Sequence, residues 1–138
     1  MPKWHWRELN LLQMYDILRE TEWCRLAVEE DGQPWCVPMH FQFEIAKGVT
    51  FIHLTMPDHG RKLEAMAQND RVCLEFELPG CAWLDVLVVT GRATVGLYVP
   101  GELIHLRVRV LEMSARRFFV PDGKECDWED DEEYPPSE

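Results

Sequence analysis

Apolar and polar residues alternate one by one over much of this sequence, and the alternation points to a chain built mainly of strands. It is strict from Ile104 to Val110, where Ile, Leu and Val residues alternate with His and Arg. Successive side chains of a strand point to opposite faces, so this segment needs one buried and one wet face. The same period occurs in segments 35–44, 72–78 and 84–89.

The other segments complete a set of six strands and two helices. Apolar residues at helical spacing predict an amphipathic helix over about 8–20. The turn signal Asp31-Gly32 joins two strands into a hairpin, and segment 49–55 is apolar enough for a central strand. Asp58 can then cap a second helix, with Leu63, Met66 and Ala67 on its inner face. Without strand-helix-strand repeats, an antiparallel barrel with flanking helices is expected, in the α+β class.

The acidic charge of the chain is concentrated at one end. The net charge is −11, and the segment from Asp122 to Glu138 holds nine acids and one Lys, which leaves −3 for the rest. A length of 138 residues fits one domain. We therefore expect a folded domain over 1–121 and an acidic, flexible tail over 122–138. No basic face is visible, so nucleic acid is not expected as a partner.

The sequence shows no segment typical of a membrane or secreted protein, which bears on its cellular location. No stretch approaches the roughly 20 apolar residues of a membrane span, and Met1 to Arg7 include no apolar segment of the kind a signal peptide needs. The five cysteines form no Cys-x-x-Cys pair and are expected to be reduced and structural. A cytoplasmic protein without a membrane partner is the expectation.

The segment from Phe51 to Leu63 is the most informative about function. It reads as a strand that leads through a polar turn into a helix. The first turn of a helix has unpaired N–H groups and partial positive charge, so it attracts phosphate. Arg61 and Lys62 add two positive charges there, and Thr55 adds a hydroxyl donor. The pattern indicates a phosphate site, with a solvated first helical turn as the alternative.

Six short pieces follow one another along the chain: Cys24–Val28, Asp31–Pro34, Val37–Phe41, Phe51–His53, Gly60–Leu63 and Asn69–Cys73. In their order and spacing they resemble the pyridoxamine-phosphate-oxidase-like FMN-binding split barrels, especially the nitroimidazole-resistance (Nim-type) branch. The resemblance extends from about Ile17 to Val95. It implies a six-stranded split barrel and a homodimer with FMN bound between the two barrels.

The resemblance also implies a set of site residues. Thr55, Arg61 and Lys62 match its phosphate-binding positions, and His53 matches a histidine near the flavin with an active-site role. His53 and His40 are the candidate catalytic residues, as proton donors, because imidazole titrates near neutral pH. His40 stands where the family commonly has Asn. The expected cofactor-binding residues are Val37, Pro38, Met39, His40, Phe41, His53, Leu54, Thr55, Arg61 and Lys62.

Two functions of different classes follow. The first is an FMN-dependent oxidoreductase that passes electrons from a reduced donor to a small acceptor such as a nitroaromatic. The alternative is a non-catalytic flavin- or haem-binding module, a carrier or sensor, and a deazaflavin in place of FMN also stays open. The chain has no G-x-G-x-x-G nicotinamide fingerprint, which is compatible with both. A metal site built from His40, His53 and His59 lacks an obvious carboxylate partner and is not expected.

Overall fold

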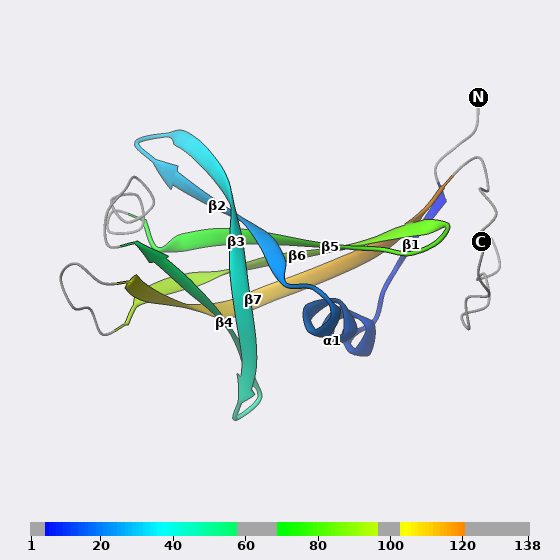
Figure 1. The fold of residues 1–138 in the computed structure, drawn as a ribbon, viewed down its shortest axis with the longest axis horizontal. Coiled ribbons are helices and arrows are strands. Elements are labelled where there is room, and N and C mark those ends of the chain that lie inside the picture. The colour runs from blue at the N-terminus through cyan, green and yellow to red at the C-terminus, as the bar shows by residue number, and fades with distance from the viewer. Residues whose placement is uncertain (1–4, 58–68, 97–102, 121–138) are drawn as a thin grey trace.

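The computed structural model describes residues 5–57, 69–96 and 103–120. The predicted second helix and the acidic tail lie outside these ranges. Within them the protein is mostly antiparallel sheet with one helix (Figure 1), which confirms the expected mainly β fold. The elements are β1 (His5–Glu8), α1 (Leu11–Glu20), β2 (Trp23–Glu30), β3 (Gln33–Ala46), β4 (Val49–Pro57), β5 (Arg71–Pro79), β6 (Trp83–Val95) and β7 (Leu103–Phe119).

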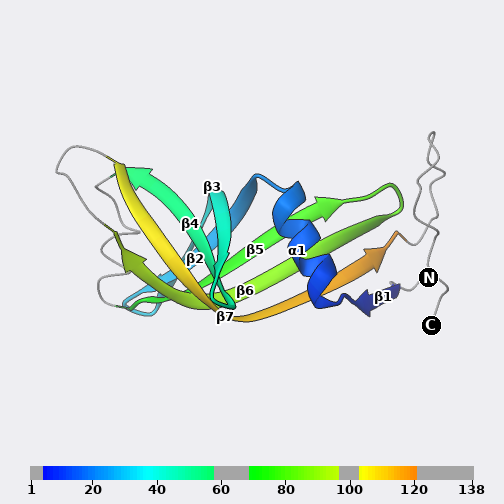
Figure 2. The ribbon, with the colours of Figure 1, turned by 90° about the horizontal axis from the view of Figure 1, so that it is seen from below.

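Six of the strands close into a ring. They follow the order β7-β4-β3-β2-β5-β6, and β6 pairs back onto β7, with every pairing antiparallel. This ring is the six-stranded split barrel that the sequence predicted. The short β1 is a seventh strand, which pairs with the C-terminal end of β7. Figure 2 shows β5, β6 and β7 continuing away from the β3–β4 hairpin toward β1 and α1.

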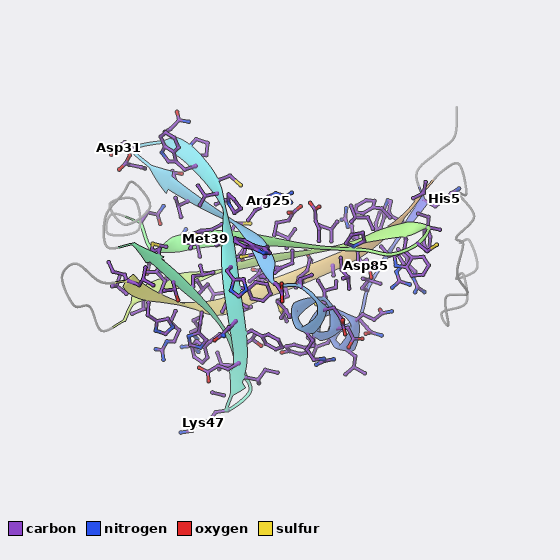
Figure 3. The ribbon with its side chains drawn as sticks, viewed as in Figure 1. His5, Arg25, Asp31, Met39, Lys47 and Asp85 are labelled. Carbon is purple, nitrogen blue, oxygen red and sulfur yellow. The ribbon has the colours of Figure 1, made fainter. Side chains whose placement is uncertain are left out.

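Two tight turns define the ends of β3. Asp31 and Lys47, labelled in Figure 3, precede Gly32 and Gly48, and all four residues have positive φ. This left-handed backbone is the conformation that two-residue hairpin turns require. The hairpin predicted at Asp31-Gly32 is confirmed, and β3 is paired with β2 before its midpoint and with β4 after it.

Helix α1 begins later than the predicted residue 8. Asn10 is its N-cap: the Asn10 side chain accepts a hydrogen bond from the backbone N–H of Gln13, and the Gln13 side chain accepts one from the backbone N–H of Asn10, both at 2.9 Å. This reciprocal capping box sets the start of the helix. The helix packs against β5, β6 and β7, with Ile17 and Leu18 buried. The hydroxyls of Tyr15 and Thr50 are 2.7 Å apart, which ties the helix to the start of β4.

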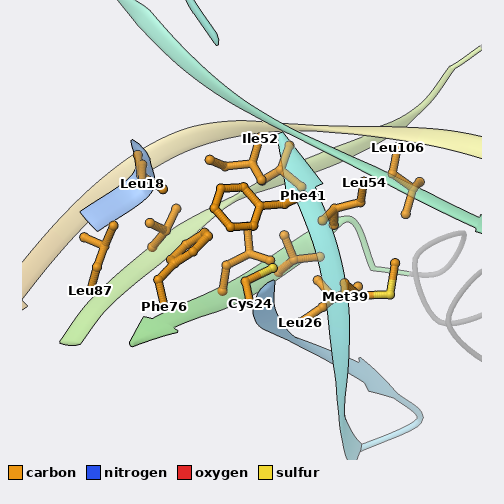
Figure 4. Close-up of a cluster of buried hydrophobic side chains, with 14 of the residues drawn as sticks. Leu18, Cys24, Leu26, Met39, Phe41, Ile52, Leu54, Phe76, Leu87 and Leu106 are labelled. Atoms are coloured by element: carbon orange, nitrogen blue, oxygen red, sulfur yellow. The ribbon is translucent and has the colours of Figure 1, made fainter. Parts of the chain in front are cut away.

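The core fills the inside of the barrel (Figure 4). The alternation predicted for β7 is confirmed, because Ile104, Leu106 and Val108 are buried while His105 and Arg107 are exposed. Burial of such apolar area is the main driving force of folding. Among the fully buried side chains are Leu26, Ile52, Leu54, Leu74, Phe76, Leu87, Val89 and Leu106.

The inner face of β6 departs from a purely apolar pattern. Its buried residues include Asp85, which forms a two-pronged ion pair with Arg117 of β7 at 2.7 and 2.9 Å. Both side chains are less than a tenth exposed, and the Arg117 guanidinium lies 4.5 Å from the ring centre of Trp83. A buried carboxylate needs such a partner. The sequence pattern did not reveal this pair.

The cysteines differ in state. Cys24 is buried, Cys73 is half-buried and Cys36 is exposed, and all three are free thiols. Cys81 is disulfide-bonded, which corrects the expectation that all the cysteines are reduced. Burial raises the pKa of the Cys24 thiol to about 12. None of the helices within the described ranges has the length and apolar character that crossing a membrane requires.

Candidate functional site

A pocket of about 530 Å³ lies over β3, β4 and β7 on the outside of the barrel. Strand register gathers its walls: Gln42 pairs with His53 across β3 and β4, and Thr55 pairs with His105 across β4 and β7. We call it the histidine pocket. Its lining residues are His40, Phe41, Gln42, Phe43, Glu44, His53, Thr55 and His105.

Three of the lining residues form a hydrogen-bonded chain. The Nε2 atom of His53 is 2.8 Å from Oε1 of Glu44, and its Nδ1 atom is 2.7 Å from Nε2 of His105. The two imidazole rings are within 15° of parallel, with centroids 4.8 Å apart. Since the centroids are much farther apart than the bonded nitrogens, the rings meet edge to edge. Both ring nitrogens of His53 are therefore engaged.

An exposed tryptophan adjoins the pocket. Trp23 of β2 pairs with His40 of β3, and the two rings meet edge to face with centroids 5.4 Å apart. Trp23 is 60% exposed, which is unusual for so large an apolar side chain. The ring offers an aromatic surface next to the pocket, of a kind enriched in ligand sites and interfaces.

Positive charge lies on the same sheet face. Arg107 of β7 is opposite His53 in register, and its guanidinium lies 4.7 Å from the ring centre of Phe51. The sequence predicted that Arg107 and Arg109 face solvent, and both are exposed. Their face is also the face of the pocket, so Arg107 contributes to the electrostatics there.

The structure brings together four of the residues proposed from sequence: His40, Phe41, His53 and Thr55 line the histidine pocket. Phe41 is itself 5% exposed, because its side chain packs edge to face on Phe76 in the core. Its main chain is therefore the part available to a ligand.

The remaining proposed residues lie elsewhere. The side chains of Met39 and Leu54 are buried in the core, so a ligand would reach only their main chain. Val37 is half-buried, and Pro38 is exposed and lines a separate hollow. The predicted phosphate residues Arg61 and Lys62 lie outside the described ranges.

The hollow beside Pro38 has its own charged cluster. The Nη1 atom of Arg25 lies 2.7 Å from Glu75 and 2.6 Å from Glu77. Burial raises the pKa of Glu75, and its hydrogen bond with Glu77 raises it further. Each acid has the same arginine as a partner, so the cluster is explained as a structural ion pair.

Three polar residues that line the pocket, Gln42, Glu44 and His105, were missed from sequence. Alternation placed Glu44 on the face of His40, but nothing in the sequence indicated that Glu44 would reach His53. His105 belongs to the polar side of β7 and touches His53 only because β4 and β7 pair. Residue spacing does not encode which strands are neighbours. Among the described residues no group of three or more His, Cys, Asp and Glu is arranged to hold a metal ion.

No family model matches this chain, and no curated protein matches it in sequence. Its structure is similar to an FAD-binding protein from Mesorhizobium loti, with a TM-score of 0.74, 22% identity, and coverage of 84% of this chain and 98% of the other. A candidate 5-nitroimidazole antibiotic resistance protein from Bacteroides thetaiotaomicron matches with a TM-score of 0.71, 16% identity, and coverage of 84% and 89%.

A third solved structure, a candidate pyridoxamine 5′-phosphate oxidase from Corynebacterium glutamicum, matches with a TM-score of 0.68 and 19% identity, covering 83% of this chain and 99% of the other. At these identities the similarity establishes the fold. The fold of this chain is that of the pyridoxamine 5′-phosphate oxidase-like split-barrel proteins, as the sequence pieces predicted.

Proposed function

We propose that this protein binds a flavin, FMN, in the histidine pocket and acts as an oxidoreductase on a small acceptor such as a nitroaromatic. The observation that carries the proposal is the pocket itself, which His40 and His53 both line on the outside of a split barrel. The similar structures that are named as FAD-binding proteins support the choice of a flavin.

The chemistry of the pocket fits a flavin nucleotide. The ring system needs an apolar surface, which the neighbouring Trp23 offers beside His40, and its polar edge needs donors. Imidazole N–H groups and the Thr55 hydroxyl are such donors. The volume of about 530 Å³ lies within the roughly 300–1,000 Å³ of small-molecule sites.

The carboxylate of Glu44 orients the proposed ligand. The Glu44 carboxylate lies 2.8 Å from Nε2 of His53, two residues before Thr55 on β4, which is roughly 7 Å along the strand. A phosphate is repelled by the carboxylate and favoured at the Thr55 end. Residue 57 ends β4 just beyond Thr55, and Arg61 and Lys62 follow a few residues later in the chain. The phosphate clamp proposed from sequence is therefore consistent with the polarity of the pocket.

A bound flavin supplies the electron transfer, and the protein supplies binding, orientation and protons. The main chain at Phe41 and Phe43 forms one wall of the site, since both side chains pack toward the core. His40, His53 and His105 are the proton-carrying groups within it. The pocket is open on the outer face of the barrel, and the proposal is that a second copy of the chain covers it. We include the homodimer, with FMN between its subunits, in the proposal.

The exposure of His40 favours one alternative, a non-catalytic haem-binding module, because a free imidazole edge is a common ligand of haem iron. An absorbance spectrum of the purified protein separates the two, since flavin and haem have different visible bands. A flavin carrier without turnover is the other alternative. If reduced, FMN-loaded protein is not reoxidised by a nitroaromatic faster than free reduced FMN, the carrier function is favoured.

Titration with FMN tests the phosphate clamp. The double variant Arg61→Ala, Lys62→Ala is expected to bind FMN more weakly by roughly 1.5–3 kcal/mol, or about 10- to 150-fold in Kd. The double variant Arg19→Ala, Arg116→Ala removes the same charge from exposed positions on α1 and the end of β7, and it should bind as wild type does. Equal binding by both double variants would remove Arg61 and Lys62 from the site.

A further inference from the structure

We infer that Glu44, His53 and His105 form a proton relay in which His105 is the acid that faces the ligand of the histidine pocket. His53, the proton donor expected from sequence, then acts as a positioning residue. The relay rests on the proposed function only for the identity of its proton acceptor, the molecule bound in the pocket.

The hydrogen bonds determine which nitrogens carry protons. A carboxylate accepts hydrogen bonds and cannot donate them, so the 2.8 Å contact with Glu44 requires a proton on Nε2 of His53. In the neutral ring, Nδ1 of His53 is then an acceptor, and the 2.7 Å contact requires a proton on Nε2 of His105. This order follows from the network, and it leaves Nδ1 of His105 as the open end of the chain.

The exposure of the two histidines and the surroundings of His105 agree with a chain that runs from Glu44 through His53 to His105. The His53 side chain is 21% exposed, whereas His105 is exposed and also lines the pocket. Gly96 donates its N–H to the carbonyl of His105 at 2.7 Å. A Cβ on residue 96 would lie 3.2 Å from Nδ1 of His105. A side chain at residue 96 would therefore crowd this nitrogen.

The relay moves protons and no electrons. A protonated His105 gives the proton on Nδ1 to a basic atom of the bound molecule and returns to its neutral form, with Nε2–H still donated to His53. One proton from water at the exposed ring restores the imidazolium. Glu44 accepts the Nε2–H of His53 and thereby keeps Nδ1 of that ring as the acceptor for His105. Other charged or titratable groups on this face include His40 of β3, Arg107 and Arg109 of β7, and Arg92 of β6, which is opposite Arg109 in register.

Nitrogen-15 NMR of the flavin-free protein tests the chain without any ligand. The expected result is a protonated Nε2 on both His53 and His105, with a scalar coupling across the hydrogen bond from His105 Nε2 to His53 Nδ1. Glu44→Ala should abolish the coupling, and Glu44→Gln, which keeps an acceptor oxygen, should retain it. Glu112→Gln, on an exposed part of β7, is the control. A proton on Nδ1 of His53, or a Glu44→Ala protein indistinguishable from wild type, would overturn the relay.

A kinetic measurement separates proton delivery from positioning. In His105→Gln, the side-chain amide can still donate to Nδ1 of His53 but cannot transfer a proton. With FMN bound, this variant is expected to slow proton-limited reduction of a nitroaromatic by about 10²-fold or more. His53→Gln should slow it less. An equal or smaller loss in His105→Gln would refute the assignment, whereas failure to bind FMN would refute the proposed function and leave the NMR result as the test of the relay.

Discussion

The Nδ1 atom of His53 and the Nε2 atom of His105 are 2.7 Å apart, although the two residues are 52 positions apart in the sequence. They meet because β4 and β7 are antiparallel neighbours, with Thr55 opposite His105 and His53 opposite Arg107. The same pairing helps to close the barrel. The candidate site is thus a direct product of the sheet, and strand pairing that stabilises the fold also positions its chemistry.

Gly91 is expected to tolerate no side chain. The register of β6 and β7 shifts between Thr90 and Gly91, and a Cβ on Gly91 would lie 2.3 Å from the backbone carbonyl oxygen of Arg109. Backbone cannot move aside as a flexible side chain can, so Gly91→Ala should lower the free energy of unfolding by about 1–3 kcal/mol. Urea unfolding measures the loss. The neighbouring exposed Thr90→Ala is the control, and an equal effect in both would contradict the steric explanation.

The buried ion pair Asp85–Arg117 is expected to stabilise the fold more than an exposed ion pair does. Asp85→Ala removes the carboxylate that makes two hydrogen bonds with the buried Arg117 guanidinium, so the free energy of unfolding should fall by about 3–5 kcal/mol. The exposed pair Asp16–Arg19 on α1 is the comparison. Asp16→Ala should change the free energy of unfolding by less than about 1 kcal/mol. Thermal or urea unfolding distinguishes these outcomes. Similar losses in the two variants would show that burial does not govern the effect.

The buried thiol of Cys24 is expected to make the stability of the fold depend on pH under alkaline conditions. Burial raises the pKa of its thiol from 9.0 to about 12. Between these values the unfolded chain releases the proton while the folded chain retains it, so stability falls as pH rises from about 9 to 12. Cys24→Val cannot titrate and should lose less stability over this range. The difference in slope, measured by urea unfolding at each pH, could reach about 1.4 kcal/mol per pH unit. Parallel curves would show that Cys24 does not titrate as described.

Local patterns predicted the fold better than the site. Alternation in β7 correctly placed Leu106 and Val108 inside the barrel, and the turn signal Asp31-Gly32 correctly joined β2 to β3. These features depend on neighbours in sequence. The start of α1 was wrong because the capping role of Asn10 was overlooked.

Contacts between distant strands were beyond the reach of the sequence. Asp85 could not be matched with Arg117, nor His53 with His105, because each pair depends on strand neighbours and register. Alternation alone also left open whether the face of His40 binds a ligand or only meets solvent. The structure shows a pocket on that face, lined by His40 and His53.

FMN titration of wild type and Thr55→Val, followed by flavin fluorescence, tests the central proposal most directly. Thr55→Val keeps the side-chain shape and removes the hydroxyl at the end of the pocket where the phosphate is proposed. We predict saturable binding by wild type, and binding at least about 10-fold weaker in Thr55→Val. Thr90→Val, an exposed threonine on β6, should match wild type. Absence of saturable binding by wild type, or equal affinity in all three proteins, would contradict a flavin site in the histidine pocket.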